Sequence, residues 1–542
     1  MTREEFESWV RALAELARDR PRLYRLRVAL LAAVGYGFAY LLFLAILAIV
    51  VGIVAVIGSA EMPTGMAAAA VLALSLPLFG TIAVMVRAMR VQIPPPQGVK
   101  LDPARTPLLF EQVEILRRKV GAPPVHAILI DHGFTASLAQ LPRLGLFGWY
   151  RNILTVGLPL MQAISPQQFS AVLAHELGHL AGRHASFGAW IYRIKQTWGR
   201  LLVAFESQRA FGIGLLQRFT AWYVPLFDAY TFILRRDQEY EADRLSARLV
   251  TPANAADALM NTEIAAAFLD QHFWPEVLQL AGQSADPPAG VFAMMARMLP
   301  KASAAPDAPK WLRQALLVET SFADTHPCLA DRLGSLGHLA KAQSILEVAW
   351  QTTPPEPLKI TAAEHFFGPN LESLLNLLER AWRTQILTLW HQRHADLAEA
   401  RRRLDALNRK SQFDTLTERE LLDQCVLTKQ LCGNAQAMPM LQELLAQHPR
   451  HPALRLLLGQ VLLEENDPAG IGHIEFAMQR DLDLVYQGCE LIYTYLKRAG
   501  QSENAMQYLR RAEQHYGSLR AAERERDGLN ATDAFKPHDL TG

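Results

Sequence analysis

The sequence predicts a mainly α-helical protein in which one domain, of α+β type, also contains a small sheet. Three observations support this fold class. Two long uncharged apolar runs lie within the first hundred residues, an HExxH motif falls inside a predicted helix, and turn signals recur at a regular spacing near the C-terminus. We therefore expect an N-terminal helical hairpin, a mixed central domain and a C-terminal helical repeat domain within the 542 residues.

The composition excludes several classes of protein. Its 54 Lys and Arg residues nearly balance 53 Asp and Glu residues, so the charge indicates no nucleic-acid partner. The four cysteines are far apart and form no CxxC pair, which excludes a disulfide framework and a thiolate zinc site. We expect reduced thiols in a cytosolic environment.

The first apolar elements predict a transmembrane helical hairpin at residues 28–90, after a basic segment at residues 1–27. Val28 to Gly58 contains no charge, and Ala67 to Val86 is a second such run; both are long enough to cross a bilayer. Ser59 to Gly65 forms a short turn between them. A cleaved signal peptide fits poorly because a second span follows directly. The alternative is a hydrophobic hairpin buried inside a soluble protein.

Basic residues flank both sides of the predicted hairpin and are absent from its connecting turn. They are Arg18, Arg20, Arg22, Arg25 and Arg27 before the first span, and Arg87, Arg90 and Lys100 after the second. Lys and Arg near the ends of spans are retained on the cytoplasmic side. We therefore expect both ends of the hairpin, and everything that follows it, to face the cytoplasm.

Residues 95–340 read as a mixed α and β domain. Pro103 to Val120 predicts an amphipathic helix that ends at Gly121. Val125 to Ile130 and Asn152 to Val156 are β-prone runs separated by a stretch rich in glycine and proline. Ser165, Pro166 and Gln168 supply an N-cap, a first-turn proline and a capping-box partner, so a helix is predicted from Pro166 through His179.

That helix carries the HExxH motif. His175 and His179 are four residues apart, so they lie on one helix face and can hold one tetrahedral zinc ion. Glu176 is then beside the open coordination position, where it can act as a general base. The alternative is a pair of histidines on a polar helix face without a ligand.

Two candidates compete for the third metal ligand. Continuation of the motif as HExxHxxGxxH fails because Ala185 occupies the ligand position and His184 is displaced by one residue. The other candidate is an ExxxD on a later helix, predicted over Arg235 to Val250. There Glu239 can complete a His₂Glu site, and Asp243 can accept a hydrogen bond from the outer nitrogen of a ligand histidine.

These residues resemble the membrane zinc metallopeptidases that include HtpX and the CAAX prenyl proteases, which are gluzincins. The likeness rests on HELGH at residues 175–179, EYEAD at residues 239–243, and Thr325, His326 and Pro327 followed by Asp331, Arg332 and Leu333. It implies a zincin-type domain in which His175, His179 and Glu239 bind zinc and Glu176 is the catalytic base. It also implies that His326 contacts the substrate or the tetrahedral intermediate; a surface histidine is the alternative.

One position departs from the family pattern. The strand that borders the substrate commonly starts with an asparagine followed by alanine, whereas Phe134, Thr135, Ala136 and Ser137 occupy that place here. A threonine can form a hydrogen bond but lacks the paired donor and acceptor of an amide.

Residues 211–234 are apolar and aromatic but contain Arg218 and Asp228. Charges at the centre of a span are costly, so helices in the membrane interface or along the active-site cleft are expected. The alternative is a further transmembrane span, and the resemblance implies membrane helices in this region.

The remaining sequence is compatible with helices almost throughout. Residues 341–420 read as a helical connector that includes a solvated helix at Gln392 to Lys410. In residues 421–520 the turn residues Gly433, Asn466 and Gly500 are 33 and 34 residues apart, which is the tetratricopeptide period. Generic helical hairpins are the alternative. Residues 521–542 form a polar tail.

Taken together, the sequence predicts a membrane-anchored zinc endopeptidase with one zinc ion per chain, a polypeptide substrate and a bilayer partner. In such an enzyme, zinc lowers the pKa of its bound water and polarises the scissile carbonyl, and Glu176 moves the proton. The repeat groove can hold a protein client or adaptor near the zinc. The likeness to HtpX implies quality control at a bacterial inner membrane. The alternative function is a non-catalytic or restrained membrane scaffold with a structural zinc site.

Overall fold

The computed structural model describes residues 3–59, 63–89, 95–142, 150–181, 213–320, 326–344, 357–501, 504–516 and 518. It contains two compact units. Unit 1 comprises residues 1–266, 292–306 and 320–378, and unit 2 comprises residues 267–291, 307–319 and 379–542. The predicted tail at 521–542, the alternative ligand His184 and Thr325 lie outside the described residues.

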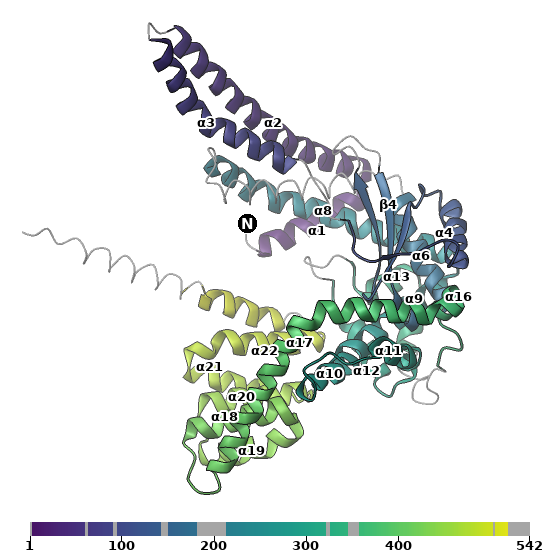
Figure 1. The fold of residues 1–542 in the computed structure, drawn as a ribbon, viewed down its shortest axis with the longest axis vertical. Coiled ribbons are helices and arrows are strands. Elements are labelled where there is room, and N and C mark those ends of the chain that lie inside the picture. The colour runs from purple at the N-terminus through teal and green to yellow at the C-terminus, as the bar shows by residue number, and fades with distance from the viewer. Residues whose placement is uncertain are drawn as a thin grey trace, which may run out of the picture. The chain divides into compact units, whose positions relative to one another are not determined.

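Unit 1 begins with three helices, α1 (Arg3–Asp19), α2 (Pro21–Ser59) and α3 (Thr64–Met89). Figure 1 shows α2 and α3 as a long antiparallel hairpin. Within the described residues, these are the two helices long and apolar enough to cross a membrane, and only 17% and 18% of their most apolar windows are buried inside the protein. The predicted hairpin is therefore present, and most of its side chains project outward.

The sheet of unit 1 has four strands in the order β1-β2-β4-β3. These strands are β1 (Val99–Lys100), β2 (Ala127–Asp131), β3 (Ala136–Pro142) and β4 (Tyr150–Gly157). β4 pairs in parallel with β2, where Ile128 faces Leu154, and in antiparallel with β3, where Leu138 faces Leu154. The two predicted strands are present, and the stretch between them supplies β3, which forms one edge of the sheet.

Further helices of unit 1 pack against this sheet or against one another. They are α4 (Pro107–Val120), α5 (Leu158–Ala163), α6 (Pro166–Ala181), α8 (Ile213–Leu249), α9 (Pro252–Phe268, shared with unit 2), the 3₁₀ segment η4 (Leu299–Ala304), α13 (Leu329–Ser335), α14 (Leu339–Ser344), α16 (Ala362–Phe367) and the 3₁₀ segment η6 (Gly368–Asn370). α4 starts four residues later than predicted because Asp102 forms a turn, accepting hydrogen bonds from the Ala104 amide and the Thr106 hydroxyl.

α8 differs from the prediction of separate elements before and after residue 235. It is one helix of 37 residues that contains Pro225 and runs on through residue 249. Its first half packs against α2: the Tyr24 hydroxyl donates to the Tyr230 carbonyl, and the rings of Phe38 and Phe219 stack with centroids 3.8 Å apart. Because no glycine or proline follows Pro225 within the helix, nothing stops helix propagation into the segment that contains Glu239.

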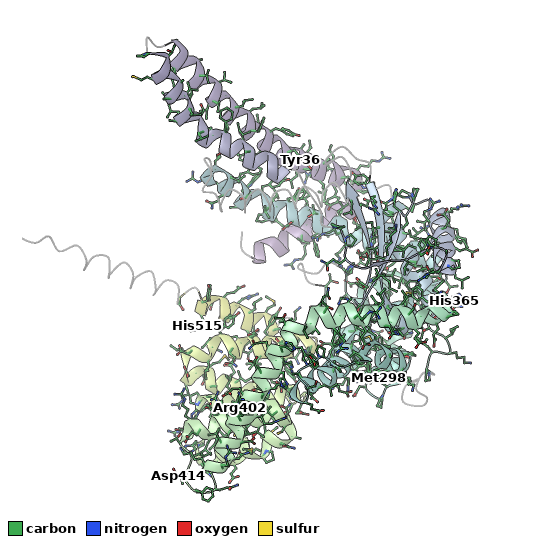
Figure 2. All side chains as sticks on the ribbon, viewed as in Figure 1. Tyr36, Met298, His365, Arg402, Asp414 and His515 are labelled. Atoms are coloured by element: carbon green, nitrogen blue, oxygen red, sulfur yellow. The ribbon has the colours of Figure 1, made fainter. Side chains whose placement is uncertain are left out.

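Unit 2 is helical throughout its described residues. Its elements are the π-helical segment η2 (Leu269–Phe273), α10 (Trp274–Gln279), η3 (Leu280–Gly282), α12 (Ala308–Leu317), α17 (Leu371–Lys410, which begins in unit 1), α18 (Glu418–Cys432), α19 (Asn434–Gln447), α20 (Pro452–Glu464), α21 (Ala469–Arg480), η7 (Leu482–Leu484) and α22 (Val485–Arg498). Helix α11 (Val291–Met298) belongs to unit 1 except for its first residue. Figure 2 marks Arg402 on the long helix α17 and Asp414 in the turn that follows it.

The C-terminal part of unit 2 consists of helix pairs. α18 pairs with α19, α20 with α21, and α22 precedes a helix at residues 504–516. The predicted turn residues Gly433, Asn466 and Gly500 all have positive φ angles, of 86°, 62° and 72°. The helical hairpins are thus present at the expected positions, and their assignment as tetratricopeptide repeats stays a prediction.

Candidate metal centre

The metal centre is built on two helices of unit 1, α6 and α8. The predicted capping box starts α6: the Gln168 amide donates to Ser165 Oγ, and the Ser165 amide donates to Gln168 Oε1. A Cβ atom at Gly178 would lie 3.2 Å from Leu245 and 3.4 Å from the Cα of Ala242. The small residue inside the HELGH sequence therefore lets α8 approach α6 closely.

Three side chains from these helices converge on one point. His175 Nε2 and His179 Nε2 are 3.1 Å apart, and they lie 3.5 Å and 3.4 Å from the two carboxylate oxygens of Glu239. Among the described residues, this is the group of three His, Cys, Asp or Glu side chains that could hold a metal ion. His175 and Glu239 are only 7% and 6% exposed.

The chemistry of this cluster fits zinc. Zinc–nitrogen and zinc–oxygen bonds of about 2.0–2.1 Å in a tetrahedron place ligand atoms about 3.3 Å apart, close to the distances found here. Asp243 Oδ1 lies 2.9 Å from His175 Nδ1, so Nδ1 can donate its proton to Asp243 while Nε2 is the ring atom placed to bind a metal ion. The Glu239 carboxylate is buried, and its Oε2 atom is 3.5 Å from His175 Nε2 while its Oε1 atom is 3.4 Å from His179 Nε2. A cation between these atoms would satisfy all three.

Arg332, on α13, holds this arrangement from behind. Its Nε and Nη2 atoms donate to the two carboxylate oxygens of Asp243 at 2.9 Å and 2.6 Å. Next to it, Asp331 accepts hydrogen bonds from Arg236 of α8 and from the Thr320 hydroxyl. The sequence assigned no role to Arg332 itself. The signal that could have identified it was its place beside Asp331 in the third segment of the family resemblance.

The buried charges of this network shift one another's pKa values. Burial lowers the pKa of His175, but hydrogen bonds with Asp243 and Glu239 outweigh this effect and raise it to about 9. Burial and the neighbouring His175 charge lower the pKa of His179 to about 4. Burial raises the pKa of Asp243, but Arg332 and His175 outweigh it and lower it to about 2. Glu239 is also held ionised, because hydrogen bonds with His175 and His326 overcome its desolvation.

A comparison with known protein families identifies the domain that contains this metal centre. Residues 147–340 match the model of peptidase family M48. The chain contains an M48 peptidase domain. A search of curated proteins found no significant match. The family is zinc-dependent, so its presence together with the His175–His179–Glu239 cluster implies zinc metallopeptidase activity on a polypeptide.

Glu176 of the M48 domain lies outside the cluster of three, on the wall of an adjoining cavity of about 220 Å³. Burial raises the pKa of its carboxyl, and Glu239 raises it further, while the positive charges of His175, His326 and Arg332 act in the opposite direction. The carboxyl therefore lies beside the metal centre without belonging to the ligand group.

His326 and Thr135 line the same cavity, Thr135 from outside the residues that match the family. His326 Nδ1 lies 2.8 Å from Glu239 Oε2, and the histidine side chain is 57% exposed. Thr135 is directly before β3, and its hydroxyl donates to the Ala136 carbonyl at 3.2 Å. The structure thus brings together all six predicted site residues, which are His175, Glu176, His179, Glu239, Asp243 and His326, and it adds Arg332.

Proposed function

We propose that this protein is a membrane-anchored zinc endopeptidase whose active site faces the cytoplasm. The observation that carries the proposal is the His175–His179–Glu239 cluster with Glu176 on the wall of the adjoining cavity. His175, His179 and Glu239 would hold one zinc ion per chain. When bound, zinc supplies a Lewis acid that acidifies a water molecule and polarises the scissile carbonyl.

Residues of the chain then carry the proton transfers. Glu176 accepts a proton from the attacking water and later delivers it to the nitrogen of the leaving amine, so the peptide bond breaks without an acyl-enzyme. His326 is exposed beside the cluster, where it can donate a hydrogen bond to the oxyanion that develops on the carbonyl oxygen. Arg332 and Asp243 are positioning residues, because they fix the tautomer and orientation of His175.

The substrate is proposed to bind as an extended strand along β3. β3 is at the edge of the sheet, and the residues at its start, Thr135 and Ala136, line the cavity that also contains Glu176. An edge strand offers backbone donors and acceptors that an unfolded polypeptide can pair with. Most strands of a folded protein are already paired within their own sheet, so the geometry favours unfolded or locally extended clients.

The location and cellular role form a further part of the proposal. Basic residues flank α2 and α3 at their outer ends, which supports an inner-membrane hairpin with the M48 domain on the cytoplasmic side of a bacterial membrane. The first half of α8 packs along α2 from Tyr24 to Phe38, which lies inside the uncharged run, and this supports an association of α8 with the membrane hairpin. The helix pairs of residues 418–516 would recruit clients or adaptors, in agreement with a role in protein quality control.

The alternative function is a scaffold with a structural zinc ion. A structural zinc site normally has four protein ligands, whereas three candidates meet in the described residues. This difference favours catalysis over a structural role.

Metal removal tests the proposal. The detergent-solubilised protein is expected to cleave an unfolded model protein, to lose this activity after treatment with a chelator, and to regain it when stoichiometric zinc is returned. His179→Ala protein should not regain activity under the same treatment. Cleavage that persists in the chelated protein would contradict a zinc-dependent mechanism.

A further inference from the structure

The cavity beside Glu176 extends beyond the metal centre to α9. One face of α9 forms its wall, with Ala255, Ala258, Leu259, Thr262 and Glu263 at helical spacing. Ala255 and Ala258 pack in a cluster with Ala171 of α6 and Ala247 of α8, and these small side chains leave the space open. A volume of about 220 Å³ is smaller than the sites that hold drug-sized ligands. It is suited to one amino-acid side chain.

Carboxylates are the most numerous ionisable side chains on the cavity wall. The lining contains three carboxylates, of Glu176, Asp243 and Glu263, one guanidinium, of Arg332, and the imidazoles of His175 and His326, which lie at the metal centre. Arg332 is already paired bidentately with Asp243. Glu176 is engaged in proton transfer under the proposed function. The carboxylate left to meet an incoming group is therefore that of Glu263.

Glu263 has no ion-pair partner within 4 Å among the described residues, and it is exposed to solvent. Surrounding protein atoms nevertheless raise the pKa of its carboxyl by desolvation, and the nearby Arg332 only partly opposes this effect. One helix position before it, the Thr262 hydroxyl is buried without a hydrogen-bond partner. Both groups gain from a ligand that brings hydrogen-bond donors and a positive charge.

We propose that this cavity is the subsite for a substrate side chain adjacent to the scissile bond, and that Glu263 selects lysine or arginine there. The inference rests on the proposed function, because it names the substrate class of the same active site. The aliphatic stem of such a side chain would lie along Leu259 and the alanines, and its cationic end would meet Glu263. The Thr262 hydroxyl oxygen would accept a further hydrogen bond from this cationic end.

The test maps the bonds cleaved in an unfolded protein by mass spectrometry. Wild-type enzyme should show lysine and arginine enriched at one position flanking the cleaved bond. Glu263→Gln should reduce this enrichment about fivefold after normalisation to total cleavage, because one partly screened ion pair is lost. Glu263→Lys should shift the preference to aspartate and glutamate. Glu111→Gln, which removes an exposed acid on α4 outside the cavity, is the matched control and should leave the enrichment unchanged.

A binding experiment separates this inference from the proposed function. Zinc-loaded Glu176→Gln protein, with and without Glu263→Gln, is titrated with alanine-rich peptides in which one lysine is moved through every position. A lysine position that tightens binding about fivefold, and does so only when Glu263 is intact, supports the subsite even if wild-type protein cleaves nothing. The inference would be overturned if the wild-type enzyme cleaved without any lysine or arginine enrichment. It would also be overturned if the enrichment and the binding preference persisted in the Glu263→Gln protein.

Discussion

The metal centre and the C-terminal hairpins both depend on closely packed helix pairs, but different groups occupy the two interfaces. Between α6 and α8, Gly178 permits a close approach, and the buried interface contains His175, Glu239 and Asp243. Between α20 and α21, a Cβ atom at Gly459 would lie 2.7 Å from the Gly470 carbonyl oxygen. The residues buried there are apolar, among them Leu456, Leu463, Ile474 and Ala477.

This difference separates two uses of the same packing. Burying the charged side chains of the polar interface costs free energy unless each charge has a partner, so this interface depends on a few specific contacts. Its role is chemical and not stabilising. The apolar interface gains stability from burial and tolerates exchange between similar side chains. Substitutions in the first interface should therefore change activity most, and substitutions in the second should change the free energy of unfolding.

The largest effect is expected at the third zinc ligand. Glu239→Ala removes one of the three candidate ligands and leaves the two histidine Nε2 atoms facing each other. Zinc content should fall well below one ion per chain, and the cleavage rate should fall by about a thousandfold or more, since a general base cannot act without the activated water. Elemental analysis and a cleavage assay measure both. Retention of one tightly bound zinc ion would show that Glu239 is not a ligand.

A smaller effect on the same interface is expected at Arg332. Arg332→Lys keeps the positive charge but cannot donate two parallel hydrogen bonds to Asp243. The orientation of His175 should loosen, and zinc affinity or kcat should fall about 10- to 100-fold, as is usual for groups that support metal ligands. A zinc titration against a competing chelator and steady-state kinetics separate the two quantities. Wild-type values for both would assign Arg332 to folding alone.

The apolar interface is probed by a pair of glycines. Gly459→Ala places a methyl group against Ile474 and the Gly470 carbonyl, so the helices must separate and the free energy of unfolding should fall by about 1–3 kcal/mol. Gly472, on the next helix, has open space around its Cβ position. Gly472→Ala is the matched control and should gain about 0.5–1 kcal/mol from helix propensity. Thermal unfolding of the C-terminal helix pairs measures both changes in the free energy of unfolding. Equal effects of the two substitutions would contradict the close contact of Gly459 with α21.

The same comparison explains which features the sequence could predict. HELGH and EYEAD are local patterns with fixed helical spacing, so His175, His179, Glu239 and Asp243 could be assigned without a structure. The turn residues of the helix pairs could also be found, because positive φ favours glycine and asparagine. Both kinds of signal are contained within a few consecutive residues.

Contacts between distant segments could not be predicted in this way. The pairing of Arg332 with Asp243 joins residues separated by 89 positions, and the weak motif around Asp331 does not reveal its partner. Composition alone indicated a connection at β3, which contains no β-branched side chain, and only the family resemblance implied the start of a strand at residues 134–137. Pairing with β4 determines the conformation of β3. The wall that α9 contributes to the cavity likewise depends on tertiary packing.

Activation of a zinc-bound water by Glu176 is tested most directly by exchanging that carboxylate for its amide. Wild-type and Glu176→Gln proteins are compared at equal zinc content, with cleavage of an unfolded protein as the readout. We expect the variant to retain one zinc ion per chain and its melting temperature but to cleave about a thousandfold more slowly. Equal cleavage by the two proteins, or equal inactivity with zinc bound in both, would contradict it.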